Sequence, residues 1–182
     1  VARGNVSGAE PFAAYGKRVT AGAESNIVWP NGAYVIPTSS GVSLSFVSTS
    51  AQDGTSGTGI RTIEVHYLDT SLVSQHTTVA LNGLTPVSNA VTGVRFVQCM
   101  HMVTYGSGKA AAGNISAYTG SDTYSYISTG AVRCSSSVRM VPAGKRLLIL
   151  AAVGGIISGT AAAQGTIQIA ASAFDGHDYT DD

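Results

Sequence analysis

The segment Thr62-Ile-Glu-Val-His-Tyr-Leu68 alternates polar and apolar side chains, and this alternation is typical of a β-strand with one face buried. The pattern predicts an inward face of Ile63, Val65 and Tyr67 and an outward face of Thr62, Glu64 and His66. After a polar turn the alternation resumes over residues 75–81, and Asn-Gly at 82–83 closes it. The stretch therefore predicts a β-hairpin followed by a second tight turn.

Short apolar runs separated by turn residues continue along the chain to Phe174, and none has the period of a long helix. The chain of 182 residues contains 22 Gly, 22 Ser and 18 Thr, a mixture that disfavours helix. Further strands are expected at residues 42–46, 95–105, 114–119, 124–128, 131–141, 147–152 and 166–171, with a turn at Pro142 to Lys145. The segment 95–105 has bulky side chains on both faces and is expected to be central.

These features predict an all-β chain, specifically a jelly-roll-like antiparallel β-sandwich of about eight to ten strands. Residues 1–26 lack any period and are expected to form an extended N-terminal arm. Residues 27–174 would form the sandwich domain, and residues 175–182 an acidic C-terminal tail. Trp29 lies near the end of the arm and is expected to anchor it to the domain.

The charge is low and balanced, because the chain has 10 basic and 10 acidic residues, or 11% charged. This composition argues against a disordered chain of high net charge and against binding nucleic acid through its phosphates. The longest nearly apolar run, Leu147 to Ile157, is about half the length of a membrane-spanning helix, so we expect no membrane partner.

The four histidines do not show metal-ligand spacing. His66 and His76 are expected to share the outer face of the hairpin, either as half of a metal site or as a cross-strand polar pair. We favour the polar pair, because only Glu64 and Asp69 lie near in sequence and no third histidine follows. His101 is expected to be buried and hydrogen-bonded, and Asp175-Gly-His177-Asp178 would be a weak, flexible ligand set. The expectation is no metal and no cofactor.

No arrangement for catalysis is apparent. Gly57-Thr-Gly59 and Gly106-Ser-Gly108-Lys109 are expected to be turns, since Ala110 stands where a phosphate loop needs Ser or Thr. No Gly-x-Ser-x-Gly motif joins a strand to a helix. A carboxylate pair for glycoside cleavage would have to come from residues expected mostly in arms and turns: Glu10, Glu24, Asp53, Glu64, Asp69, Asp122 and the tail. We therefore expect no enzyme and no catalytic residue.

Two further groups of side chains have competing interpretations. Cys99 and Cys134 are expected to be small buried apolar residues of a protein made in a reducing cytosol. Tyr105, Tyr118, Tyr124 and Tyr126 either form an exposed platform for a sugar ring, or line strands and subunit contacts.

Several segments, taken in order, resemble a family of virion structural proteins of tailed bacteriophages. They are Val47 to Asp69, Thr78 to Val87, Val94 to Phe96, Gly113 to Ile115 and Met140 to Lys145. The chain departs from the pattern at His76 and Thr77, where the family usually carries an acid. The resemblance implies a jelly-roll subunit of a phage particle and transfers no catalytic residue.

The expected function is therefore a capsid decoration, or cement, protein in the virion, assembled in the host cytoplasm. Its partners would be the major capsid protein or other virion proteins and further copies of itself, with a trimer favoured. A surface with few charges agrees with this role, because interface cores are depleted of charge. The alternative is a receptor- or glycan-binding appendage of the head or tail.

Overall fold

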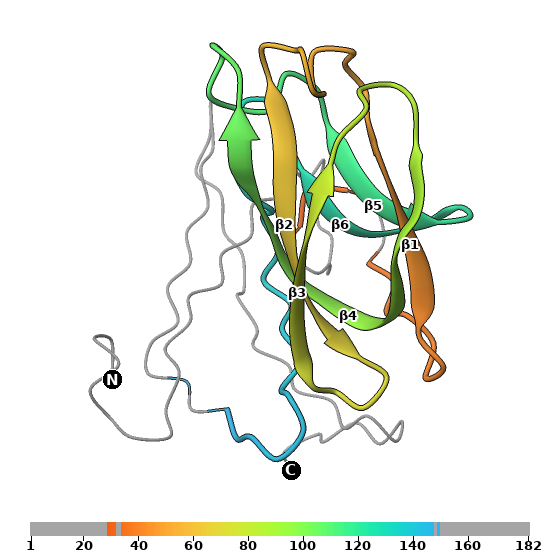
Figure 1. The fold of residues 1–182 in the computed structure, drawn as a ribbon. Coiled ribbons are helices and arrows are strands. Elements are labelled where there is room, and N and C mark those ends of the chain that lie inside the picture. Colours follow the sequence, from red (N-terminus) through yellow and green to blue (C-terminus); the bar gives the residue numbers. More distant parts are fainter. Residues whose placement is uncertain (1–28, 32–33, 148, 150–182) are drawn as a thin grey trace, which may run out of the picture. The chain divides into compact units, whose positions relative to one another are not determined.

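The computed structural model describes residues 29–31, 34–147 and 149. The chain divides into two compact units, residues 1–146 and 147–182, and every strand of the described residues belongs to the first. The described residues contain six strands and no helix (Figure 1). The strands are β1 (Val42–Ser48), β2 (Ile60–Asp69), β3 (Ser74–Ala80), β4 (Val87–Tyr105), β5 (Ile115–Thr119) and β6 (Asp122–Ile127).

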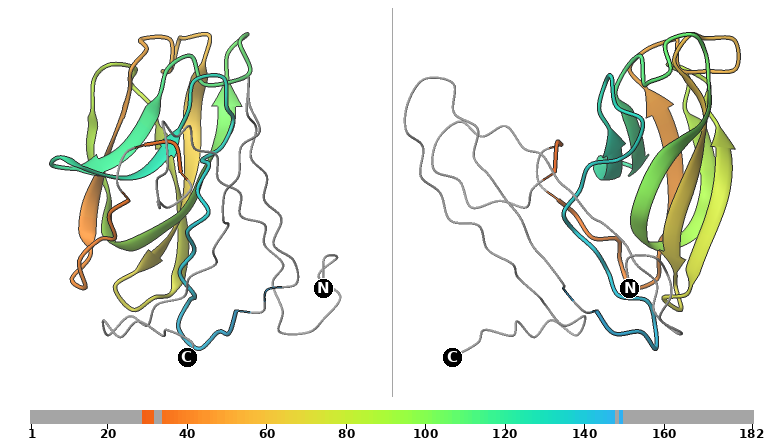
Figure 2. Two further views of the ribbon diagram at one scale, coloured as in Figure 1. Left: turned by 180° about the vertical axis from the view of Figure 1, so that it is seen from behind. Right: turned by 90° about the vertical axis from the view of Figure 1, so that its left-hand side faces the viewer.

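All six strands form one antiparallel sheet in the order β3-β2-β4-β1-β5-β6. The central strand is β4, whose first half pairs with β1 and whose second half pairs with β2. The sheet curls, so that β6 contacts β4 although the two are not neighbours in the sheet. In the right-hand view of Figure 2, β5 and β6 face the layer that contains β2, β3 and β4. The predicted all-β antiparallel fold is confirmed.

The apolar positions of the alternating segments fill the space enclosed by the curled sheet. Leu44 and Phe46 of β1 are fully buried, as are Ile63 and Val65 of β2. They belong to one continuous core with Ile60, Val79, Leu81, Val91, Val94, Val97, Met100, Ile115, Ala117, Tyr124 and Ile127. The period-2 interpretation is confirmed for β1 and for Ile63 and Val65 of β2, whereas Tyr67 is only partly buried against this core and the next residue, Leu68, is fully buried.

Burial on both faces, predicted for the whole segment 95–105, is found only at its start: residues 94–97 of β4 are buried, whereas residues 103–105 are exposed. Phe96 is buried outside the main core and pairs with Leu68 of β2 in the register. Tyr34 contacts Phe96, and the buried Trp29 packs edge-on against Tyr34 with ring centroids 5.1 Å apart. Trp29 therefore attaches the start of the described chain to the sheet, while the predicted arm (1–26) lies outside the described residues.

Two strand predictions differ from the structure. Residues 87–94, which open β4, were not expected as a strand, because their sequence shows little alternation, and only Val91 and Val94 among them are buried. Residues 131–141 were expected as a strand and are largely irregular. Arg133 forms an isolated bridge with His101, and the backbone hydrogen bonds of Val132 and Cys134 to Met102 and Met100 are not continued as a ladder among the described residues.

The remaining structural expectations concern residues 142–182 and a membrane-spanning segment. The predicted turn at 142–145 is present, since Lys145 N–H donates to the Pro142 carbonyl. The predicted strand at 166–171 and the acidic tail at 175–182 lie outside the described residues, as does most of the predicted strand at 147–152. In the described part of the chain, no helix is long and apolar enough to cross a membrane.

Candidate functional site

Three loops, residues 49–59, 81–86 and 106–114, meet around Asp53 at one end of the sheet. This carboxylate is fully buried and accepts four hydrogen bonds. The donors are the Ser48 hydroxyl (2.6 Å) and the backbone N–H groups of Ile60 (2.8 Å), Ala112 (2.9 Å) and Gly113 (2.8 Å). Asp53 is therefore a structural residue that ties loop 49–59 to loop 106–114, and it is not available as a catalytic acid.

The two glycine-rich segments pack against each other at this end. Gly106 N–H donates to the Gly59 carbonyl and Gly108 N–H donates to the Thr58 carbonyl, both at 2.8 Å. A Cβ atom at Gly106 would lie 2.2 Å from the Gly57 carbonyl oxygen, so only glycine allows this approach. The prediction that these segments are turns is confirmed, and their role is close backbone packing.

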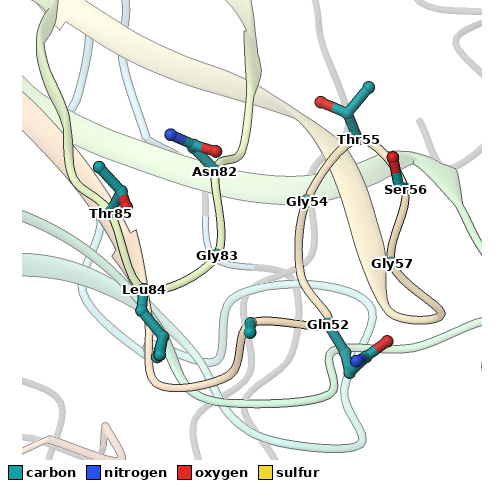
Figure 3. A pocket seen from close by; sticks show the side chains of 10 residues that line it. Gln52, Gly54, Thr55, Ser56, Gly57, Asn82, Gly83, Leu84 and Thr85 are labelled. Carbon is teal, nitrogen blue, oxygen red and sulfur yellow. The ribbon is translucent and has the colours of Figure 1, made fainter.

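A shallow pocket lies beside these loops (Figure 3). It is lined by Ala51, Gln52, Gly54, Thr55, Ser56, Gly57, Asn82, Gly83, Leu84 and Thr85. None of these side chains is titratable, so the pocket offers hydrogen-bonding groups and no acid, base or activated nucleophile. Its lining therefore gives no support to a catalytic role.

A cluster of ionisable side chains lies instead on the outer face of β3, β2 and β4, and sequence reasoning did not assemble it. His66 and His76 are direct cross-strand partners with stacked rings 5.8 Å apart, as predicted for the hairpin. The strand register also places His101 of β4 directly opposite Glu64 of β2. The His101 ring then stacks against His66, with centroids 5.2 Å apart.

His66 and His101 both direct their Nε2 atoms at the same oxygen atom of Glu64. His66 Nε2 lies 2.8 Å from Glu64 Oε2, and His101 Nε2 lies 3.2 Å from the same oxygen. The hydrogen bond from His66 is the main reason that the pKa of Glu64 is lowered, and the charges of His66, His101 and His76 add to it. The cluster therefore holds Glu64 as a carboxylate between two imidazoles.

The expectation that His101 is buried is wrong. Its side chain is 40% exposed, whereas its neighbour Met100 is fully buried. Successive side chains of a strand face opposite sides of the sheet, so filling the core with Met100 directs His101 outward.

The two cysteines lie close together although 35 residues separate them. Their sulfur atoms are 3.2 Å apart and both are free thiols. Because one S–H stabilises the neighbouring thiolate, the pKa of Cys134 is lowered and that of Cys99 is raised. Cys134 is buried, as expected, but Cys99 is only partly so.

The tyrosine platform is only partly available. Tyr124 is buried in the main core, which agrees with the interpretation that the tyrosines line strands and not with an exposed platform at this position. Burial raises its pKa and that of the partly buried Tyr126. Of the four tyrosines, Tyr105 is the most open to solvent. His177 and its acidic neighbours lie outside the described residues.

Compared with known protein families, curated proteins and solved structures, the chain shows no match.

Proposed function

We propose that this chain is a structural subunit of a tailed-phage virion, and that it binds the capsid as a decoration protein. The support from the sequence is the ordered set of segments that resembles virion structural proteins. Three of those segments supply the loops that meet at Asp53: residues 47–69, 78–87 and 113–115. In this proposal the chain acts through its surface contacts and not through a reaction.

The observation that carries the proposal is the exposure of large apolar side chains near one end of the sheet. Val103 and Tyr105 follow each other on one face at the end of β4, and both are more than two-fifths exposed. The exposed Val132 adjoins them, since its carbonyl accepts the Met102 N–H. Apolar side chains on a surface with few charges lose little on desolvation, which favours a protein partner.

The first test is the molar ratio of this chain to the major shell protein in purified particles. A decoration protein should be present at a high and constant molar ratio to the shell protein. The purified chain should also form homo-oligomers in analytical ultracentrifugation, most often trimers. A ratio of a few per cent would indicate an appendage instead. Absence of the chain from particles would overturn the proposal.

The second test uses surface variants of the purified chain added to shells that lack it. Val103→Asp is expected to weaken binding to the shell without lowering the melting temperature, because the side chain is already exposed. Val73→Asp is the matched control, since Val73 is similarly exposed and lies in the turn between β2 and β3, at the other end of β2 from the Val103 surface. Equal binding by both variants would show that the Val103 surface is not the contact. Binding to a glycan array, lost on Tyr105→Ser, would favour the appendage alternative.

A further inference from the structure

We propose that Glu64, His66 and His101 form a binding site for a divalent transition-metal ion, with Zn²⁺ as the best match. The three ligand atoms, one from each residue, all lie within 4.8 Å of one another. This inference does not depend on the proposed role in a virion.

The backbone of the sheet places the three side chains. Glu64 and His66 are two positions apart on β2 and share its outer face, while His101 is the direct partner of Glu64 on β4. Strand β2 is paired on both sides, with β3 and with β4, and His101 of β4 is held by β2 on one side and by an isolated bridge to Arg133 on the other. A site on paired strands is held more rigidly than one on loops, which favours binding of an ion.

The distances are close to those of a zinc site. An ion with bonds of about 2.0–2.2 Å in a tetrahedron separates its ligand atoms by roughly 3.4 Å. The two separations from Glu64 Oε2, 2.8 and 3.2 Å, are shorter than this value by about 0.6 and 0.2 Å. Both imidazole rings are partly exposed, so each can turn the lone pair of its Nε2 atom toward an ion. The ion would replace the present contacts of these two Nε2 atoms with Glu64 Oε2.

The donor set also selects the ion. Two imidazoles and one carboxylate suit Zn²⁺ and its neighbours in the first transition row, whereas Mg²⁺ and Ca²⁺ prefer oxygen ligands. With three protein ligands the fourth position is open to water or to His76, whose ring stacks on His66. Among the described residues, no other group of three His, Cys, Asp or Glu side chains converges in this way.

The test is equilibrium dialysis and calorimetry of the metal-free full-length chain with ZnCl₂, and visible spectroscopy with CoCl₂. One ion per chain is expected, and the cobalt spectrum should be that of a low-symmetry site with nitrogen and oxygen ligands. A strong sulfur-to-cobalt charge-transfer band would show that the ion binds Cys99 or Cys134 instead, and would overturn the proposed ligand set.

The variants Glu64→Gln, His66→Asn and His101→Asn are each expected to lower the Zn²⁺ affinity by at least about tenfold. Replacing a residue that only orients a metal ligand already lowers metal affinity by about that factor. His177→Asn is the matched control, since His177 is the one other histidine that is neither a proposed ligand nor a partner of His66, and the Zn²⁺ affinity of this variant should equal that of the unmodified chain. Loss of binding in His177→Asn with retention in His66→Asn would overturn the proposal.

A second measurement needs no variant. In the unmodified chain, paramagnetic Co²⁺ should broaden the NMR signals of residues around Glu64, His66 and His101 before any others. Broadening elsewhere, or no binding of either ion by any method, would contradict the site.

Discussion

The Oδ2 atom of Asp53 accepts a hydrogen bond of 2.8 Å from the backbone N–H of Gly113, a residue 60 positions further along the chain. The same carboxylate also accepts hydrogen bonds from Ser48, Ile60 and Ala112. One buried side chain thus determines how the loops at this end of the sheet are joined. A buried donor that loses its acceptor costs about 1–3 kcal/mol, so the carboxylate is expected to be a major stabilising group.

Asp53→Asn should lower the free energy of unfolding by about 3–5 kcal/mol, because an amide NH₂ group replaces one acceptor oxygen and faces two donors. Urea denaturation followed by circular dichroism measures this change. Asp122→Asn on β6 is the control, since that carboxylate is partly exposed to water, and a loss below about 1 kcal/mol is expected there. Similar losses in the two variants would contradict the structural role of Asp53.

Gly106→Ala should destabilise the protein by about 3 kcal/mol, because the added Cβ would overlap the Gly57 carbonyl and push the two glycine-rich loops apart. Gly120→Ala provides the comparison. It has open space around it and a φ of 58°, so only the left-handed backbone strain of roughly 1–2 kcal/mol is expected. Thermal melts of both variants test the difference, and a larger loss at Gly120 would refute the close packing of the loops.

Cys99 and Cys134 should form an intramolecular disulfide when the chain is treated with oxidised glutathione. A thiolate of the pair displaces one glutathione to give a mixed disulfide, and the second cysteine then displaces the other, so two glutathione thiols are released. The sulfur atoms, now 3.2 Å apart, have to approach to about 2.05 Å.

Mass spectrometry of the intact chain should show the loss of two hydrogens. The closed loop should raise the free energy of unfolding by up to about 4 kcal/mol. Cys134→Ser is the control, and it should give only the glutathione adduct. Dimers linked through Cys99 in the unmodified chain would argue against the pairing.

Asp69→Asn should weaken the turn between β2 and β3 at neutral pH. The Asp69 carboxylate accepts hydrogen bonds from the Gln75 side chain and from the backbone N–H groups of Val73 and Ser71, and these bonds lower its pKa. A lowered pKa in the folded state stabilises the fold at pH values above the unfolded pKa, near 4, and this contribution is lost as the pH falls through the folded value.

The unmodified chain should therefore be more stable than Asp69→Asn at pH 7, and the difference should shrink toward zero at a second pH value below the lowered pKa of the Asp69 carboxyl. Denaturant titrations at the two pH values measure it. A difference that does not depend on pH would mean that the ionised carboxylate does not support the turn.

Local pattern was sufficient for much of the fold. The alternation in residues 62–68 and 75–81 predicted the hairpin of β2 and β3, and it predicted that Ile63 and Val65 face the core. Side chains of a strand repeat every two residues whatever the strand pairs with, so the buried face can be inferred from the segment alone. The turns at 57–59 and 106–109 were predictable for a similar reason, because glycine-rich segments favour turns locally.

The chain's sequence by itself thus determined that this is an all-β protein, which positions along β1 and β2 are buried, and that few charged groups are present. Only the tertiary structure decided that His101 lies opposite Glu64, that Cys99 meets Cys134 and that Tyr124 enters the core. Strand order and register join segments 35 or more residues apart, and they depend on how all the apolar faces pack at once. A period along one segment carries no information about its partner, so the cluster of Glu64, His66 and His101 appears only when β2 and β4 are paired.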